Sequence, residues 1–225
     1  MSKPKIEANG LTFTWNNKCS CYQFNLPPVQ SCPGVVKRLR DPRSICNYCY
    51  AKYGRFGQME ASQRILQRNL EIVREGHLDR IYPKFLAGLS KATEKIKFFR
   101  WLGWGDVINY NFRSVIFSSA LAFPEVQFWC PTQNRDMDAL SRRASGNLAV
   151  RFTQTVMGHP APAGGHTTLL PGQKSLPGHF VCPGKCERCR KCWEPWDPKT
   201  RIAFPFHGSN MLIAKLNKAR RLYMF

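Results

Sequence analysis

The stretch that decides the fold reads KIKFFRWLGWGD at residues 95–106, a short apolar run followed at once by two glycines and an aspartate. The run is apolar at both odd and even positions, which is typical of a strand buried on both faces of a parallel sheet. Active-site residues of parallel barrels gather where such strands end. We therefore predict a functional edge at Gly103, Gly105 and Asp106.

Similar elements alternate on either side of this strand. We expect strands over residues 11–26, 95–102, 126–130, 148–155 and 201–206, and helices over residues 58–78, 83–89, 112–121, 136–143 and 210–223. Short apolar runs separated by helices favour parallel strands joined by right-handed crossovers. The prediction is an α/β fold, either an open α/β sheet or a partial (β/α)6 barrel, with a C-terminal cysteine-rich metal-binding segment.

The domain organisation follows from a proline- and glycine-rich stretch over residues 159–178 that lacks any periodicity. It predicts a loop or lid that leads into the second group of cysteines. We assign residues 1–158 and 200–225 to the partial barrel with its N-terminal cluster loop. Residues 159–199 are assigned to the lid loop and a cysteine-rich auxiliary segment.

The composition indicates which partners the protein binds and in which cellular compartment it resides. Lys and Arg outnumber Asp and Glu by 34 to 14, a formal charge of +20, which predicts contact with nucleic acid or another polyanion; the alternative is a solubilising surface. No apolar run approaches the roughly 18 residues of a membrane span, and no signal core follows the N-terminus. We expect a cytoplasmic protein, in which ten cysteines indicate metal binding rather than disulfides.

Three cysteines, Cys32, Cys46 and Cys49, precede the first long helix. Three thiolates can hold three corners of a four-iron cluster and leave one iron open for a small molecule. The alternative is a closed zinc site, which needs a fourth ligand, and Cys19 or Cys21 could supply it. The acidic side chain of Asp106 could hold an ammonium group, or it could simply cap a helix.

Four more cysteines, Cys182, Cys186, Cys189 and Cys192, lie within eleven residues near the C-terminus. Either all four hold one four-iron centre, or three do and Cys19, Cys21 or Cys130 completes the set. Zinc is the alternative metal here too. Cys130, at the end of an apolar run, is better explained as a small buried hydrophobic residue.

Two arginines fall inside predicted strands, where a buried charge needs a partner. Arg100 and Arg151 are candidates to bind the carboxylate of a cofactor or a phosphate, and a buried ion pair is the alternative for each. His207, at the end of the last predicted strand, is a further candidate substrate or ligand residue.

The order of several motifs carries a family resemblance. They are Asn25-Leu26-Pro27, Cys32-Pro33-Gly34, Cys49-Tyr50-Ala51, Arg100 with Gly105-Asp106, and Cys182-Pro183 through Cys192-Trp193. Over residues 25–207 this order resembles the bacteriophage gene product 88 family, which looks like a relative of radical S-adenosylmethionine barrels. Leu102 stands where that family usually has a histidine. Cys46-Asn47-Tyr48-Cys49 is similar to the end of the radical S-adenosylmethionine cluster loop, although the thirteen residues between Cys32 and Cys46 exceed the usual spacing.

The resemblance implies a barrel of radical S-adenosylmethionine type with one or two [4Fe-4S] clusters in the host cytoplasm. S-adenosylmethionine would bind near Gly103, Gly105, Asp106 and Arg151, and Asp106 and Arg100 would act in catalysis. An electron-donor protein would be a partner, and a nucleic acid or nucleotide the substrate. The rival hypothesis is a non-catalytic iron–sulfur or zinc protein that binds nucleic acid and uses its metals as structural staples.

Overall fold

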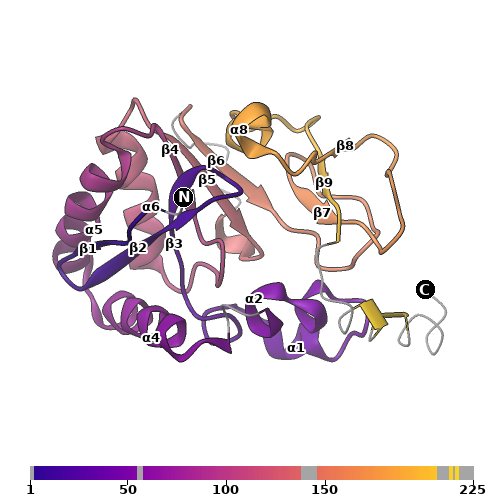
Figure 1. The fold of residues 1–225 in the computed structure, drawn as a ribbon, viewed down its shortest axis with the longest axis horizontal. Helices are drawn as coiled ribbons and strands as arrows, with labels where there is room; N and C mark the ends of the chain where they lie inside the picture. The colour runs from indigo at the N-terminus through magenta and orange to yellow at the C-terminus, as the bar shows by residue number, and fades with distance from the viewer. Residues whose placement is uncertain (1–2, 55–57, 138–145, 207–212, 215, 218–225) are drawn as a thin grey trace.

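A six-stranded sheet organises the protein in the computed structural model, which describes all residues except 1–2, 55–57, 138–145, 207–212, 215 and 218–225. In sheet order the strands are β1 (Ile6–Ala8), β2 (Leu11–Asn16), β3 (Cys21–Phe24), β4 (Phe98–Trp101), β5 (Gln127–Thr132) and β6 (Leu148–Phe152). The first three strands pair antiparallel, and β3 to β6 pair parallel (Figure 1).

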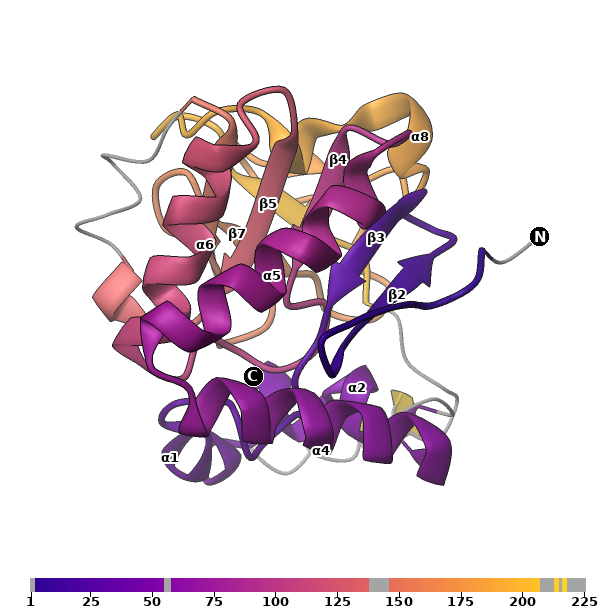
Figure 2. The same cartoon turned by 90° about the vertical axis from the view of Figure 1, so that its left-hand side faces the viewer.

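Three long helices pack against this sheet. They are α4 (Glu60–Glu75), α5 (Leu78–Thr93) and α6 (Tyr110–Ala122), and Figure 2 shows α5 and α6 lying across the strands with α4 below them. Because sheet order follows chain order from β3 to β6, right-handed crossovers put α5 and α6 on the same face. None of the described helices is long and apolar enough to cross a membrane.

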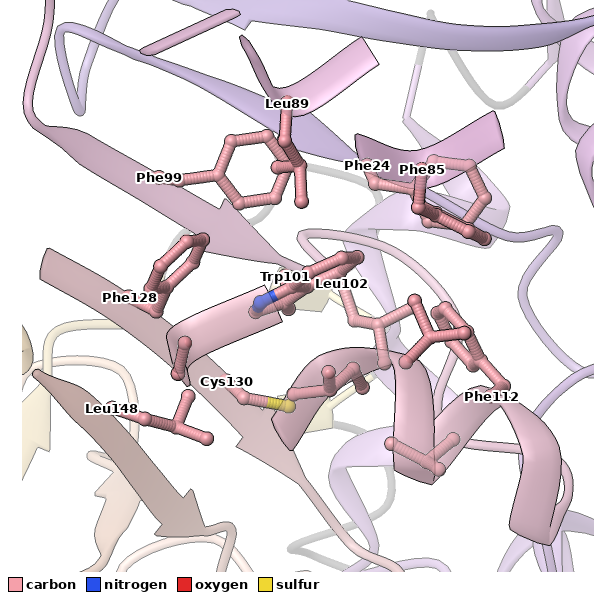
Figure 3. Close-up of a cluster of buried hydrophobic side chains, with 14 of the residues drawn as sticks. Phe24, Phe85, Leu89, Phe99, Trp101, Leu102, Phe112, Phe128, Cys130 and Leu148 are labelled. Carbon is pink, nitrogen blue, oxygen red and sulfur yellow. The ribbon is translucent and has the colours of Figure 1, made fainter. Parts of the chain in front are cut away.

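The main core lies between the sheet and these helices. Phe99 and Trp101 of β4 point into it, as do Phe128 and Cys130 of β5 (Figure 3). Trp101 is fully buried, with rings of α5 and α6 against it. The alternate residues of the same strands point to the opposite face, so both faces must be covered.

A smaller unit, called the annex below and comprising residues 159–206, covers that opposite face. It holds β7 (His166–Thr168), β8 (Phe180–Val181), α8 (Cys186–Cys189), the 3-10 turn η3 (Lys191–Trp193) and β9 (Ile202–Phe204). Its three strands form a separate parallel sheet in the order β7-β9-β8. The indole nitrogen of Trp193 donates to the carbonyl of Phe99 at 3.0 Å, which docks the annex on β4.

The mixed α/β fold with a parallel-rich sheet is confirmed, whereas the described residues form no closed barrel. The expected strand 201–206 does not extend the main sheet, because β9 pairs with β7 and β8. The expected strand 11–26 is a hairpin of β2 and β3. Helix α5 starts at Leu78 and not at Pro83 as expected. It runs through Pro83 with Ile81 and Phe85, on either side of the proline, buried on its core face.

Two other expected helices are only partly described. The segment 136–143 begins as the 3-10 turn η2 (Arg135–Met137), and its remainder lies outside the described residues. Most of the segment 210–223, together with His207, also lies outside them.

Asn69 of α4 ties the hairpin to the loop that follows β3. Its amide oxygen accepts from the backbone nitrogen of Thr12 at 2.9 Å, and its amide nitrogen donates to the carbonyls of Thr12 and Asn25 at 3.1 Å each. The side chain is 1% exposed, so no water replaces these bonds.

We expect Asn69→Ala to lower the free energy of unfolding by about 1–3 kcal/mol, because buried backbone groups of Thr12 and Asn25 lose their partners. Denaturant titration under oxygen-free conditions measures the change. The control is Gln67→Ala on the same helix, whose side chain pairs with exposed Glu71; it should cost under about 0.5 kcal/mol. Equal losses in the two variants would contradict the role given to Asn69.

Candidate metal centres

Cys32, Cys46 and Cys49, called the loop thiols below, lie on the long loop that follows β3. This loop contains α1 (Val35–Leu39), the 3-10 turn η1 (Ile45–Tyr48) and α2 (Tyr50–Tyr53). It lies at the carboxyl ends of the parallel strands, below the sheet in Figure 1. The three cysteines therefore come to the edge at which Gly103 and Asp106 leave β4.

Several contacts fix the loop to segments that follow the neighbouring strands. The backbone nitrogen of Ile45 donates to the carbonyl of Thr155 at 2.8 Å, beyond β6. The phenol of Tyr50 donates to the carbonyl of Gly103 at 2.9 Å, beyond β4. The thiol of Cys46 lies 3.6 Å from the amide oxygen of Gln133, beyond β5. The loop thus contacts the carboxyl ends of three other strands.

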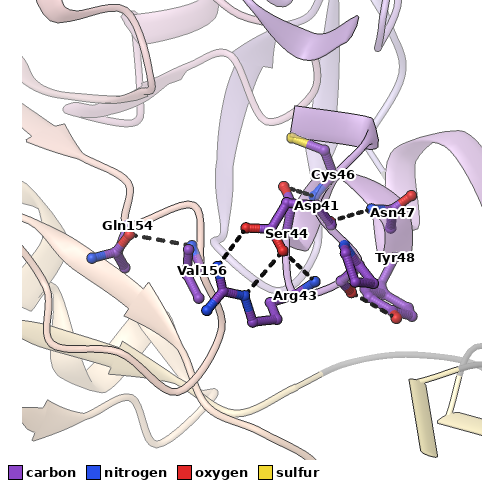
Figure 4. A network of polar contacts seen from close by, with 9 residues as sticks. Asp41, Arg43, Ser44, Cys46, Asn47, Tyr48, Gln154 and Val156 are labelled. Carbon is purple, nitrogen blue, oxygen red and sulfur yellow. Dashed lines mark hydrogen bonds and ion pairs between the residues drawn. The ribbon is translucent and has the colours of Figure 1, made fainter. Parts of the chain in front are cut away.

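Within the loop, short polar contacts set the turn that carries Cys46 (Figure 4). The hydroxyl of Ser44 accepts from the backbone nitrogen of Cys46 at 3.2 Å, which caps η1. The guanidinium of Arg43 forms an ion pair with Asp41 at 3.0 Å, and Asn47 donates to the carbonyl of Asp41 at 2.7 Å. These bonds hold the turn in one shape before any ligand arrives.

The two glycines after β4 permit close packing. A Cβ atom at Gly103 would lie 2.5 Å from the amide oxygen of Gln23, and one at Gly105, whose φ is +78°, would lie 2.4 Å from the hydroxyl of Ser31. Leu102 beside them is left-handed, with a φ of +54°. Side chains other than glycine rarely adopt this conformation, and such strain concentrates at functional sites.

Asp106 connects the segments that meet at this edge of the sheet. Its carboxylate accepts from the backbone nitrogens of Val107 and Gln133 at 2.8 Å each, and from the hydroxyl of Thr132 at 2.5 Å. Burial raises the pKa of Asp106 to about 6, although these hydrogen bonds oppose the shift. Because both oxygens are already engaged, Asp106 acts here as a positioning residue that fixes the end of β4 against the end of β5.

The loop thiols interact with one another in all three pairs. Burial, followed by the negative charge of Asp106 and of the other two thiols, raises the pKa of Cys32 to about 12. Burial likewise raises the pKa of Cys49. Thiols whose pKa is raised in this way ionise readily only when a cation is bound, which is how protein metal sites couple binding to proton release.

Three further residues at this site were not found by sequence reasoning. The guanidinium of Arg38 on α1 has a buried nitrogen without a hydrogen-bond partner among the described residues, and its charge acts on Asp106. Tyr50 and Gln133 contact the site as described above. A hollow of about 390 Å³ beside Cys32 is also lined by Gln30, Arg74 and Asn109. The sequence signals for them were the charge of Arg38 and the place of Tyr50 in the motif Cys49-Tyr50-Ala51.

The second group of cysteines gathers on the opposite face of the sheet, between the hairpin and the annex. Cys19, Cys21, Cys182 and Cys192 belong to one buried cluster with Trp129, Trp193 and Ile202, and Cys186 packs against it. The annex thiols therefore meet the two hairpin cysteines and not the loop thiols. All ten cysteines of the chain are described; Cys130 faces the helices, so neither it, Cys19 nor Cys21 completes the loop-thiol set.

Arg100 also faces this second group. Its guanidinium lies over the ring of Trp129, 4.3 Å from the ring centroid, and reaches the sulfur of Cys19 at 3.9 Å. Burial disfavours its charge, but the phenol of Tyr50 and the neighbouring thiols hold its pKa above the usual value. Arg100 thus interacts with the second group of cysteines and with Tyr50, the residue that follows Cys49 on the loop.

Arg151, also expected at a cofactor site, is fully buried and occupied by the annex. Its guanidinium donates to the backbone carbonyls of Cys192 at 3.0 Å, Gly164 at 2.9 Å, Lys191 at 3.1 Å and Glu194 at 2.9 Å. Three of these bonds hold the chain around Cys192 in place, and the fourth joins it to the segment at Gly164.

No three His, Cys, Asp or Glu side chains within the described ranges converge on one point as a metal ion would require. The thiols are instead gathered as two loose sets. The chemistry of both donor sets, thiols without histidine, suits iron–sulfur clusters and zinc.

The family model described as gene product 88 matches residues 2–159, more than half of the chain. The chain belongs to this family of phage gene products. The match includes the hairpin, the loop thiols and β1 to β6, and it ends where the annex begins. No curated protein and no solved structure matches the chain.

We expect Asp106→Asn to loosen the loop of this gene product 88 protein. Whichever way the new amide turns, its NH₂ group faces the backbone nitrogen of Val107 or Gln133, and that donor loses its acceptor at a cost of about 1–3 kcal/mol. Trypsin should then cleave faster after the basic residues between Lys37 and Arg43. Exposed Asp136→Asn is the matched control, and unchanged cleavage in Asp106→Asn would contradict the positioning role.

Proposed function

We propose that this gene product 88 protein is an iron–sulfur protein with a reaction similar to that of radical S-adenosylmethionine enzymes, acting on nucleic acid or a nucleotide. One observation carries the proposal. Three thiols, and no fourth cysteine, gather at the carboxyl ends of the parallel strands. A three-thiolate set suits a four-iron cluster with one open iron, whereas closed zinc sites need four ligands.

The residues around the loop thiols fit such a group. Cys32, Cys46 and Cys49 would hold the cluster, and the bonds around Asp106 would keep their loop at the strand ends. A four-iron cluster with bound S-adenosylmethionine supplies one-electron cleavage of the sulfonium, with methionine and 5′-deoxyadenosine as products after hydrogen-atom transfer. The unpartnered nitrogen of Arg38 is suited to the carboxylate of that cofactor.

The substrate class rests on charge. A formal +20 is reduced only slightly by thiolate-ligated clusters, so the surface attracts phosphates. The hollow beside Cys32, with Arg74 on its wall, gives a phosphate-bearing substrate a route to the site. Ten free cysteines suit the reducing cytoplasm of the host, where an electron-donor protein would reduce the clusters.

Anaerobically purified, dithionite-reduced protein should convert S-adenosylmethionine to 5′-deoxyadenosine and methionine, detected by liquid chromatography and mass spectrometry. Cys46→Ala should abolish this conversion, because two thiols cannot retain the cluster. Cys130→Ala is the matched control. It removes a buried thiol from the helix-covered face of the sheet and should preserve product formation. The proposal fails if reduced, iron-loaded protein makes neither product, with or without nucleic acid.

The charge also supports a second candidate function, a non-catalytic nucleic-acid-binding protein with structural metals. On that hypothesis, binding to a short DNA or RNA duplex should weaken steeply with salt and persist in Cys46→Ala. Fluorescence anisotropy over a series of salt concentrations measures both. Salt-steep binding in a protein that does not cleave S-adenosylmethionine would favour the binder; binding that is independent of salt would contradict it.

A further inference from the structure

We propose that Cys19, Cys182, Cys186 and Cys192 are the four ligands of one metal centre, so that the N-terminal hairpin supplies a ligand and Cys189 does not. The sequence groups four cysteines within residues 182–192, whereas the fold replaces one of them with a cysteine from the turn between β2 and β3. The inference rests on the proposal that the annex holds a metal, and it is independent of S-adenosylmethionine cleavage.

The side-chain contacts bring these four together. Cys19, Cys182 and Cys192 are 2%, 8% and 6% exposed in one buried cluster that also contains Cys21, with Cys186 packed against it. The thiol of Cys19 interacts most strongly with the thiols of Cys186 and Cys21. Cys189, at the other end of the four-residue helix α8, is not part of this cluster.

Hydrogen bonds from the hairpin and from the annex hold the backbone at Cys19 next to the annex cysteines. Asn16 accepts from the backbone nitrogen of Cys19 at 3.1 Å, and Arg190 donates to the carbonyl of Cys19 at 2.7 Å. Ser20 donates to the carboxylate of Glu187 at 2.8 Å. The hairpin turn is therefore bonded to the helix that carries Cys186, although more than 160 residues separate the partners in sequence.

Electrostatic interactions agree with this choice. Each of the six pairs among the four thiols interacts: Cys186 with Cys19, Cys182 and Cys192; Cys192 with Cys182 and Cys19; and Cys182 with Cys19. Cys189 acts on Cys182, whereas the largest interactions of Cys21 are with Cys19, Arg100 and Arg190 and not with the other three thiols. Four mutually interacting thiols supply the donor atoms of a four-iron cluster or a structural zinc ion, which would draw this loose set together on binding.

The surroundings suit a negatively charged centre. Four thiolates around a four-iron cluster or a zinc ion leave a net charge of about −2, which must be balanced when buried. The guanidinium of Arg100 lies beside the sulfur of Cys19, and that of Arg190 lies 4.1 Å from the ring centroid of Phe98. A hollow of about 280 Å³, lined by Asn17, Lys18, Ser20 and residues 184–188, gives a metal access to Cys186.

The experiment compares single substitutions in the full-length protein prepared without oxygen. Iron, zinc and acid-labile sulfide are measured per chain for the wild type, Cys19→Ala and Cys189→Ala. Cys19→Ala should lose about half of the bound metal if both centres are loaded, and Cys189→Ala should keep all of it. Cys130→Ala is the control for loss of any buried thiol, and circular dichroism verifies that each variant is folded.

A second measurement assigns the loss to the right centre. In a Cys46→Ala background, the remaining metal belongs to the annex; adding Cys19→Ala should remove it, and adding Cys189→Ala should not. If Cys19→Ala unfolds, Cys19→Ser replaces it, and its absorption or electron paramagnetic resonance spectrum should change while that of Cys189→Ser does not. Metal retained in both Cys19 variants, or lost from Cys189→Ala, overturns the assignment.

The outcomes separate this inference from the proposed function. Loss of annex metal in Cys19→Ala together with an inactive wild type supports the ligand set and refutes the reaction. A wild type that cleaves S-adenosylmethionine, together with annex metal retained in Cys19→Ala, supports the reaction and refutes the ligand set. A wild type that holds no metal at all overturns both.

Discussion

The requirement to cover both faces of a parallel sheet shapes the whole protein. Along β4, Phe99 and Trp101 enter the helix-covered core, while Phe98 and Arg100 emerge on the other side. Helices α5 and α6 cover one face, with α4 below them (Figure 2). The annex covers the other, and it must pack on a surface that includes an arginine and the hairpin. That packing brings the annex cysteines to Cys19 and Cys21.

The carboxyl edge of the same sheet collects the other thiols. Parallel strands deliver their following loops to one edge, so the loop after β3 meets the segments after β4, β5 and β6. Asp106 joins the ends of β4 and β5 through three hydrogen bonds. Tyr50 joins the loop after β3 to Gly103, which follows β4. The glycines and the left-handed Leu102 allow the backbones to approach closely enough for this.

Arginines balance the charge that two metal centres would introduce. Arg100 lies beside Cys19 and faces Tyr50, Arg151 holds the backbone around Cys192, and Arg38 adjoins Asp106. Arg38 and Arg100 each keep a buried nitrogen without a hydrogen-bond partner among the described residues, and Arg38 is the one on the cluster loop. The positions of these three side chains distinguish residues that their shared charge does not: Arg151 fixes a segment, whereas under the proposals above Arg100 would compensate a centre and Arg38 would bind a cofactor.

The sequence by itself determined the family, the alternation of strands and helices, and the two sets of cysteines, because these depend on local periodicity and short spacings. It also indicated that Cys130 is a core residue. Only the tertiary structure decided that the sheet stays open, that β9 joins the annex, and that Arg151 is engaged by carbonyls. It also decided which site Cys19 adjoins, because contacts between residues so distant in the chain depend on how two layers pack, which no local pattern records.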